Sequence, residues 1–127
     1  MSEVVTAAAM VEAAEREIRT LGVDEAADWL GREDVLFVDV RDIRELDRDG
    51  RIPGAYHCPR GMLEFWLDLD SPYHKPDLAS APQLLFFCRS GWRSALAAHT
   101  AYRMGRDDAA HIAGGFEAWR DAGHQLA

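Results

Sequence analysis

The stretch Gln83-Leu84-Leu85-Phe86-Phe87-Cys88-Arg89-Ser90-Gly91-Trp92-Arg93-Ser94 indicates the fold more clearly than any other part of this sequence. Its first five residues form a short, mainly apolar run, which is typical of a strand buried on both faces of a sheet. Residues 92–104 follow with small and apolar side chains at helical spacing, and Gly105 ends that pattern. A strand that passes through a tight turn into a helix is typical of an α/β protein, and Cys88 stands at the turn.

The remaining sequence alternates between helical and extended patterns. We expect helices over 5–19, 20–30, 42–49, 62–69 and 116–122, and further strands over 35–40, 56–58 and 109–112. Residues 70–82 are expected to form a loop because they hold three of the five prolines. This alternation predicts an α/β fold with an open, mostly parallel sheet flanked by helices. Residues 1–20 are interpreted as an N-terminal helical extension, and residues 21–127 as one domain.

The composition fits a single globular domain of 127 residues, with 48% hydrophobic residues and enough length for a core. Fourteen Lys and Arg against 22 Asp and Glu give a net charge of −8, which predicts no general attraction to nucleic acid or to an anionic membrane. No apolar run approaches the roughly 18–20 residues that span a bilayer, and Glu3 stands where a secretory signal carries basic residues. We therefore expect a cytoplasmic protein whose two cysteines, Cys58 and Cys88, are free thiols.

The position of Cys88 predicts a reactive site, because ligands of open α/β sheets bind beyond the carboxyl ends of the strands. Backbone N–H groups of the turn and of the first helical turn have no partner within the helix and can face an anion. The helix dipole, Arg89 and Arg93 favour the thiolate, and Gly91 permits the backbone angles of a tight loop. A nucleophilic sulfur in an anion-binding loop is our interpretation; the alternative is a cysteine that merely ends a buried strand.

Such a loop suits two reactions. A thiolate can attack phosphorus while the loop binds the other phosphate oxygens, or it can attack a sulfane sulfur and become a persulfide.

Four separate motifs carry a resemblance to a known family. They are Phe37-Val38-Asp39-Val40-Arg41 followed by Glu45, Arg51-Ile52-Pro53-Gly54-Ala55, Cys88 to Ser94, and Ile112-Ala113-Gly114-Gly115-Phe116-Glu117-Ala118-Trp119. In this order they resemble the rhodanese (thiosulfate sulfurtransferase) family in its short, single-domain form, with Arg51 where that family usually has His. The resemblance covers the chain from about Leu21 and implies a rhodanese-like fold for residues 21–127.

The spacing within the loop bears on the choice of reaction. In the family that the chain resembles, sulfurtransferase loops have four residues between Cys and Arg, whereas phosphatases of the same fold have five because phosphate needs a wider loop. Cys88 and Arg93 are separated by four residues, which favours sulfur over phosphate.

The resemblance implies a sulfurtransferase that works through a Cys88 persulfide. Thiosulfate or another persulfide would be the donor, and a thiol or cyanide the acceptor. Among the loop residues, Arg89 would hold the anionic end of the donor, Trp92 would form an apolar wall, and Arg93 would tie the loop to its helix. The loop N–H groups around Ser90 and Gly91 would stabilise the sulfur. No cofactor is expected, and the five histidines lack metal-ligand spacing.

Other functions remain open from the sequence. The chain is compatible with a sulfur relay module whose donor and acceptor are proteins, and less well with a phosphatase or arsenate reductase of related fold. A catalytically silent binding module is expected to lack the cysteine. Cys58 can be a small core residue or can resolve the Cys88 persulfide, by disulfide formation among other routes. Asp39 and Arg41 are expected to pair as structural residues.

Overall fold

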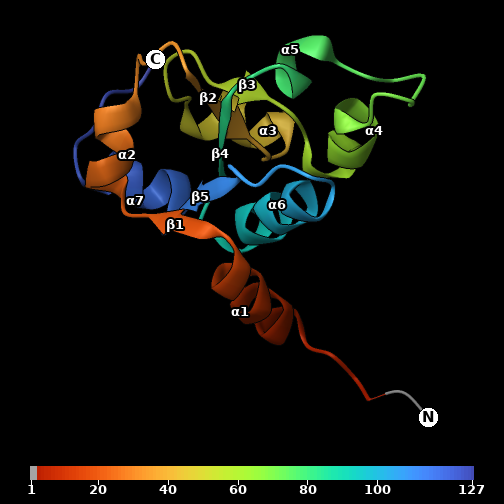
Figure 1. The fold of residues 1–127 in the computed structure, drawn as a ribbon. Coiled ribbons are helices and arrows are strands. Elements are labelled where there is room, and N and C mark those ends of the chain that lie inside the picture. The colour runs from red at the N-terminus through yellow and green to blue at the C-terminus, as the bar shows by residue number, and fades with distance from the viewer. Residues whose placement is uncertain (1–2) are drawn as a thin grey trace.

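A computed structural model, which describes residues 3–127, forms one sheet with helices on both faces (Figure 1). The strands are β1 (Arg19–Leu21), β2 (Val35–Asp39), β3 (Tyr56–His57), β4 (Gln83–Phe87) and β5 (Ala110–Ile112). The helices are α1 (Ala7–Glu17), α2 (Val23–Trp29), α3 (Ile43–Asp49), α4 (Leu63–Leu67), α5 (Pro76–Ala79), α6 (Trp92–Arg103) and α7 (Gly115–Asp121), with a 3-10 turn η1 (Arg60–Met62). The strand order is β1-β5-β4-β2-β3 with every pair parallel, which confirms the predicted α/β fold.

The prediction of a single helix over residues 20–30 is wrong at its start. Residues Arg19–Leu21 form β1, which pairs in parallel with β5, and only Val23–Trp29 are helical. Three residues are too few for an alternating pattern to be separated from a helical one, so the pairing with the distant β5 decides their conformation. The division of the chain into 1–20 and 21–127 stays a prediction, and its boundary falls inside β1.

The prediction that residues 70–82 are entirely loop is also wrong. Pro76–Ala79 form the short helix α5, and Pro76 stands in its first turn. Proline punctuates loops, but it is also favoured at the first position of a helix, where its missing N–H has no intrahelical partner. A proline in the sequence is therefore compatible with a loop and with the start of a helix.

The sheet separates two hydrophobic cores. Side chains of β4 alternate between them: Phe86 packs in the core covered by α1, α4, α5 and α6, whereas Leu85 and Phe87 pack in the core covered by α2 and α7. Figure 1 shows α1 beside α6 below the sheet, and α2 and α7 together on the left. Cys88 continues the alternation of β4 and belongs to the core on the α1 and α6 side.

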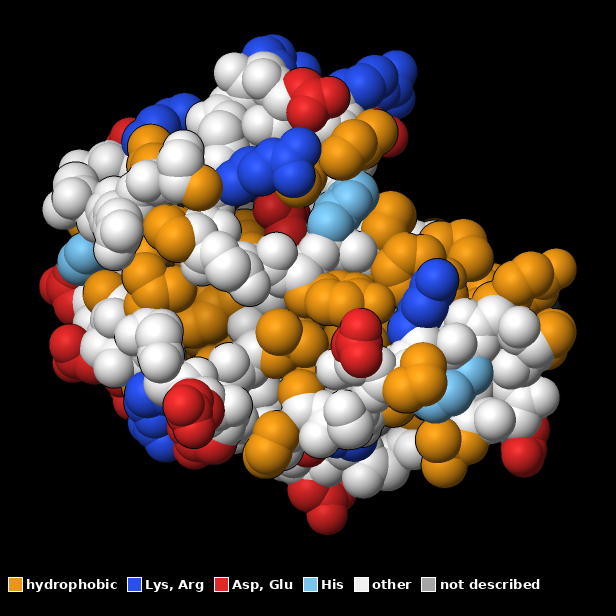
Figure 2. Space-filling model, turned by 90° about the horizontal axis from the view of Figure 1, so that it is seen from above, with side chains coloured by type: hydrophobic (Ala, Val, Ile, Leu, Met, Phe, Trp, Pro, Cys, Tyr) orange, Lys and Arg blue, Asp and Glu red, His pale blue; other side chains and the backbone are white. Residues whose placement is uncertain are grey.

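Several large hydrophobic side chains stay exposed, among them Phe65, Leu69 and Tyr73 in and after α4. On the face seen from above, hydrophobic side chains occupy much of the middle, and most charged side chains lie toward the rim (Figure 2). Exposed apolar side chains of this kind are ordinary on protein surfaces. Within residues 3–127, none of the helices has both the length and the apolar character needed to cross a membrane.

Candidate active site

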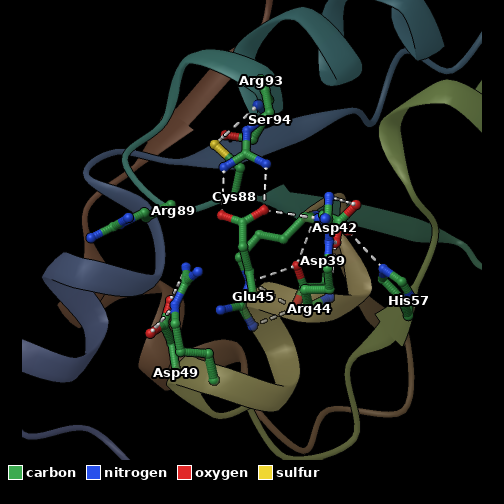
Figure 3. Close-up of polar contacts among 12 residues, drawn as sticks. Asp39, Asp42, Arg44, Glu45, Asp49, His57, Cys88, Arg89, Arg93 and Ser94 are labelled. Carbon is green, nitrogen blue, oxygen red and sulfur yellow. Dashed lines mark hydrogen bonds and ion pairs between the residues drawn. The ribbon is translucent and has the colours of Figure 1, made fainter.

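Cys88 follows β4 directly, and its sulfur lies at the N-terminus of α6 (Figure 3). The Gly91 N–H donates to Cys88 Sγ at 3.1 Å, and the Ser94 N–H points at the same atom from 3.4 Å. Gly91 has a φ of 117°, a left-handed conformation that favours glycine and turns the chain from strand to helix. N–H groups at a helix start have no intrahelical partner, so this arrangement suits a negatively charged sulfur.

The backbone of the Cys88 loop (residues 88–94) is fixed from its other side by the start of α7. The Cys88 carbonyl accepts from the Phe116 N–H at 2.8 Å, and the Arg89 carbonyl accepts from the Glu117 N–H at 3.0 Å. This approach leaves no room at Gly115, where a Cβ atom would collide with the Cys88 carbonyl oxygen. Gly115, the first residue of α7, therefore allows this helix to hold the loop.

Arg93 ties the loop to α3 through Glu45. Its guanidinium forms two charge-assisted hydrogen bonds with the Glu45 carboxylate, at 2.7 and 2.9 Å. Glu45 also accepts from the Asp42 N–H at 2.9 Å, which closes the capping box at the start of α3. The hydrogen bonds from Arg93 lower the pKa of Glu45 from 4.5 to about 2, so the pair is fully ionised at neutral pH. Arg93 was expected from the sequence to tie the loop to the helix that follows it, whereas its guanidinium contacts α3.

Arg89 points away from Cys88 and pairs with Glu117 of α7 (Figure 3). Its side chain is 52% exposed, and exposed ion pairs contribute little to stability, so an anionic ligand can compete for this guanidinium. Ser90 is exposed, and Trp92 is 54% exposed beside the loop. Binding of a donor by these residues stays a prediction.

The structure adds three residues near the sulfur that the sequence analysis did not select. Ser94 Oγ lies 3.6 Å from Cys88 Sγ and 2.9 Å from His111 Nδ1, and His111 Nε2 lies 3.1 Å from Glu15 Oε2. Ser94 was noted only for its place in the loop spacing, and His111 as one of five scattered histidines. A histidine between apolar residues in a short predicted strand was a usable signal; nothing in the sequence pointed to Glu15.

Asp39 and Arg41 form the expected ion pair, and it is buried. Arg41 Nη2 lies 2.7 Å from Asp39 Oδ2, with both side chains at most 1% exposed. Arg41 also donates to the Gly50 carbonyl at 2.9 Å, and its guanidinium stacks 4.2 Å from the centre of the Phe116 ring. The pair therefore connects the end of β2 with the start of α7, which supports the Cys88 loop.

Cys58 lies in the same hydrophobic core as Cys88, and β2 runs between the strands that the two cysteines follow. The register pairs Asp39 with both His57 and Phe87, so the two cysteines follow strands that flank β2. Two strand spacings are about 10 Å, whereas a disulfide needs Cα atoms within about 7 Å. Burial raises the pKa of the Cys58 thiol to about 12. Both observations favour a core role. In the part of the chain from residue 3 onward, no cluster of three or more His, Cys, Asp or Glu could hold a metal ion.

Comparison with known families identifies the kind of domain. A model of the rhodanese-like domain matches residues 22–122 of this chain. The chain belongs to the rhodanese family. It is 31% identical over 100 residues to the mouse thiosulfate sulfurtransferase/rhodanese-like domain-containing protein 3, a match that covers 75% of this chain and 64% of that protein.

Two solved structures are similar to this chain along most of its length. A Rhodopseudomonas palustris protein of unknown function, described as a possible tyrosine phosphatase, is 48% identical with a TM-score of 0.93, covering 100% of this chain and 99% of its own. The human single-domain sulfurtransferase is 31% identical with a TM-score of 0.66, covering 80% of this chain and 95% of its own. The names of both the mouse and the human relative include sulfurtransferase, and this chain spans 64% of the length of the mouse protein.

Proposed function

We propose that this chain is a sulfurtransferase that carries sulfane sulfur as a persulfide on Cys88. The donor is thiosulfate or a persulfide, and the acceptor is a thiol or cyanide. The observation that carries this proposal is the position of Cys88 Sγ, which faces the Gly91 and Ser94 N–H groups in a loop with four residues between Cys88 and Arg93.

The reaction has two displacement steps. The Cys88 thiolate attacks the outer sulfur of thiosulfate; a new S–S bond forms, the old one breaks, and sulfite leaves with the bonding pair. The acceptor thiolate or cyanide then attacks the outer sulfur of the persulfide, and Cys88 leaves as the thiolate. The Gly91 and Ser94 N–H groups favour the anionic sulfur before and after each transfer. Arg89 forms an exposed ion pair with Glu117. In the reaction it releases Glu117 and binds the anionic end of the donor.

Intact mass spectrometry tests the proposal directly. The reduced protein is treated with thiosulfate and desalted, and its intact mass is compared with those of the Cys88→Ala and Cys58→Ala variants treated in the same way. We expect a gain of one sulfur atom in the wild type and in Cys58→Ala, and none in Cys88→Ala. If the wild type gains no sulfur from thiosulfate or from a small persulfide, although its Cys88 thiol reacts with iodoacetamide, the proposed function is wrong.

A second candidate function is phosphatase activity, because a relative that is 48% identical is described as a possible tyrosine phosphatase. The four-residue spacing between Cys88 and Arg93 weighs against it. Hydrolysis of an aryl phosphate that is lost in Cys88→Ala, together with no sulfur uptake, would favour phosphatase activity. A sulfur relay between proteins uses the same Cys88 persulfide; sulfur uptake from a protein persulfide but not from thiosulfate would indicate it.

A further inference from the structure

His111 is a buried polar residue on the α1 and α6 side of the sheet. Its neighbours in β5, Ala110 and Ile112, pack in the core on the opposite side, so strand alternation turns the imidazole toward α1 and α6. The side chain is 1% exposed, and each ring nitrogen has a partner. Ser94 of α6 lies against Nδ1, and Glu15 of α1 lies against Nε2.

These contacts form a continuous chain to the sulfur. Cys88 Sγ lies 3.6 Å from Ser94 Oγ, Ser94 Oγ lies 2.9 Å from His111 Nδ1, and His111 Nε2 lies 3.1 Å from Glu15 Oε2. Glu15 is 40% exposed, whereas the other three side chains are buried. This series of contacts therefore connects the Glu15 carboxylate, at the surface of α1, with the buried sulfur of Cys88.

The direction of each hydrogen bond follows from the donors available. A carboxylate only accepts, so His111 donates from Nε2 to Glu15, and its Nδ1 is free to accept from the Ser94 hydroxyl. The Gly91 carbonyl, 3.2 Å from the same hydroxyl, is the competing acceptor. Ser94 Oγ can then accept from the Cys88 S–H. Burial lowers the pKa of His111 despite the opposing effect of Glu15, so the imidazole starts neutral and can take up a proton.

We propose that Cys88, Ser94, His111 and Glu15 form a proton relay in which Glu15 of the N-terminal helix promotes formation of the Cys88 thiolate. The S–H bond breaks and its proton passes to Ser94 Oγ, while the Ser94 hydroxyl proton passes to His111 Nδ1. The electron pair stays on sulfur, so the products are a thiolate and an imidazolium. Ser94 then donates to the thiolate, and the imidazolium charge is stabilised by the Glu15 carboxylate. Glu15 is a positioning residue in this scheme, since it touches no reacting sulfur.

Other charged groups also face the two ends of the relay. Arg93, which belongs to α6, lies near Cys88, and its charge is balanced by Glu45 of α3. Glu15 is the charged partner of His111. A variant of Glu15 leaves the Arg93 pair in place, so its effect on Cys88 is separable from that pair.

The relay deepens the proposed function, and its test requires no sulfur donor. Ultraviolet thiolate absorbance of the full chain is titrated against pH, with the Cys88→Ala protein subtracted. The variants are Glu15→Gln, Ser94→Ala and the double variant. Glu17→Gln is the matched control, because Glu17 also lies on α1 and pairs with a histidine of α6, His99, at 3.0 Å.

We expect Glu15→Gln to raise the pH midpoint of Cys88 ionisation, lowering the thiolate fraction at pH below the midpoint by about three- to tenfold. Glu17→Gln should leave the midpoint unchanged, although both variants remove the charge of one α1 carboxylate beside a histidine. Ser94→Ala keeps its backbone N–H and should also raise the midpoint, and adding Glu15→Gln to it should have no further effect. Equal midpoints for Glu15→Gln and Glu17→Gln, or independent effects of Glu15→Gln and Ser94→Ala, would overturn the relay.

The outcome separates the relay from the proposed function. A raised midpoint in Glu15→Gln together with no sulfur uptake by the wild type supports the relay and refutes the sulfurtransferase proposal. Sulfur uptake on Cys88 with an unchanged midpoint in Glu15→Gln does the reverse. Circular dichroism and thermal melts of each variant show whether a changed midpoint comes from a folded protein.

Discussion

The ion pair between Glu45 and Arg93 offers a quantitative test of how the Cys88 loop is held to α3. Glu45→Gln removes the charge and keeps the amide oxygen, and Gln at this position still completes a capping box with the Asp42 N–H. The substitution therefore isolates the contribution of the ion pair. Arg93 stays in place with a single neutral acceptor instead of a carboxylate.

The magnitude follows from the shift in the pKa of Glu45, which the hydrogen bonds from Arg93 lower from 4.5 to about 2. A shift of this size corresponds to at most about 3–4 kcal/mol of stability at neutral pH. Because the Arg93 side chain is 42% exposed, solvent screens the pair, and we expect about 1–2 kcal/mol. The folded pKa lies below the unfolded one, so this stability is present above pH 4.5 and is lost as pH falls toward 2.

Urea unfolding of wild type and Glu45→Gln at several pH values measures this contribution. We expect Glu45→Gln to be less stable by about 1–2 kcal/mol at pH 7, and the difference to shrink as pH is lowered below 4.5. Glu64→Gln, which breaks the exposed pair with Arg60, is the control and should show a smaller effect. A difference that stays constant down to the lowest pH at which the protein is folded would refute the assignment of the stability to the ionised pair.

Three further predictions concern the neighbourhood of the loop. Gly115→Ala should lower the melting temperature more than Gly123→Ala, because both glycines have positive φ but only the Cβ at 115 collides with the loop backbone; equal losses would contradict this. Cys58, with a pKa raised to about 12 by burial, should stay unlabelled by iodoacetamide at pH 8 in the folded protein, as peptide mass mapping would show; labelling without unfolding would contradict it. Asp39→Asn should cost about 3–5 kcal/mol in urea unfolding, because it leaves the Arg41 charge buried without its partner, and a loss below about 1 kcal/mol would argue against that reasoning.

The sequence by itself was sufficient to predict the fold class and the position of Cys88 at the turn between a strand and a helix. The apolar run of β4, the cysteine after it and the glycine before α6 are local features, and local patterns report which residues can form a buried strand, a left-handed turn and a helix start. The pairing of Asp39 with Arg41 was also predictable, because the two residues are close in sequence at a strand end. The elements β1 and α5 were not predicted, because such short elements carry too little pattern of their own.

The network around the sulfur was decided by tertiary structure. Glu15 and His111 are 96 positions apart and meet only because α1 packs on α6 and β5 lies between β1 and β4. The pairing of Arg93 with Glu45 likewise joins two helices 48 positions apart. Hydrogen bonds depend on the distance and direction between side chains in space, and no period or propensity in the sequence encodes which distant residues will meet. The sequence therefore located Cys88 at the end of a strand, and the packing of α1, α3 and α7 around its loop determined which groups lie near its sulfur.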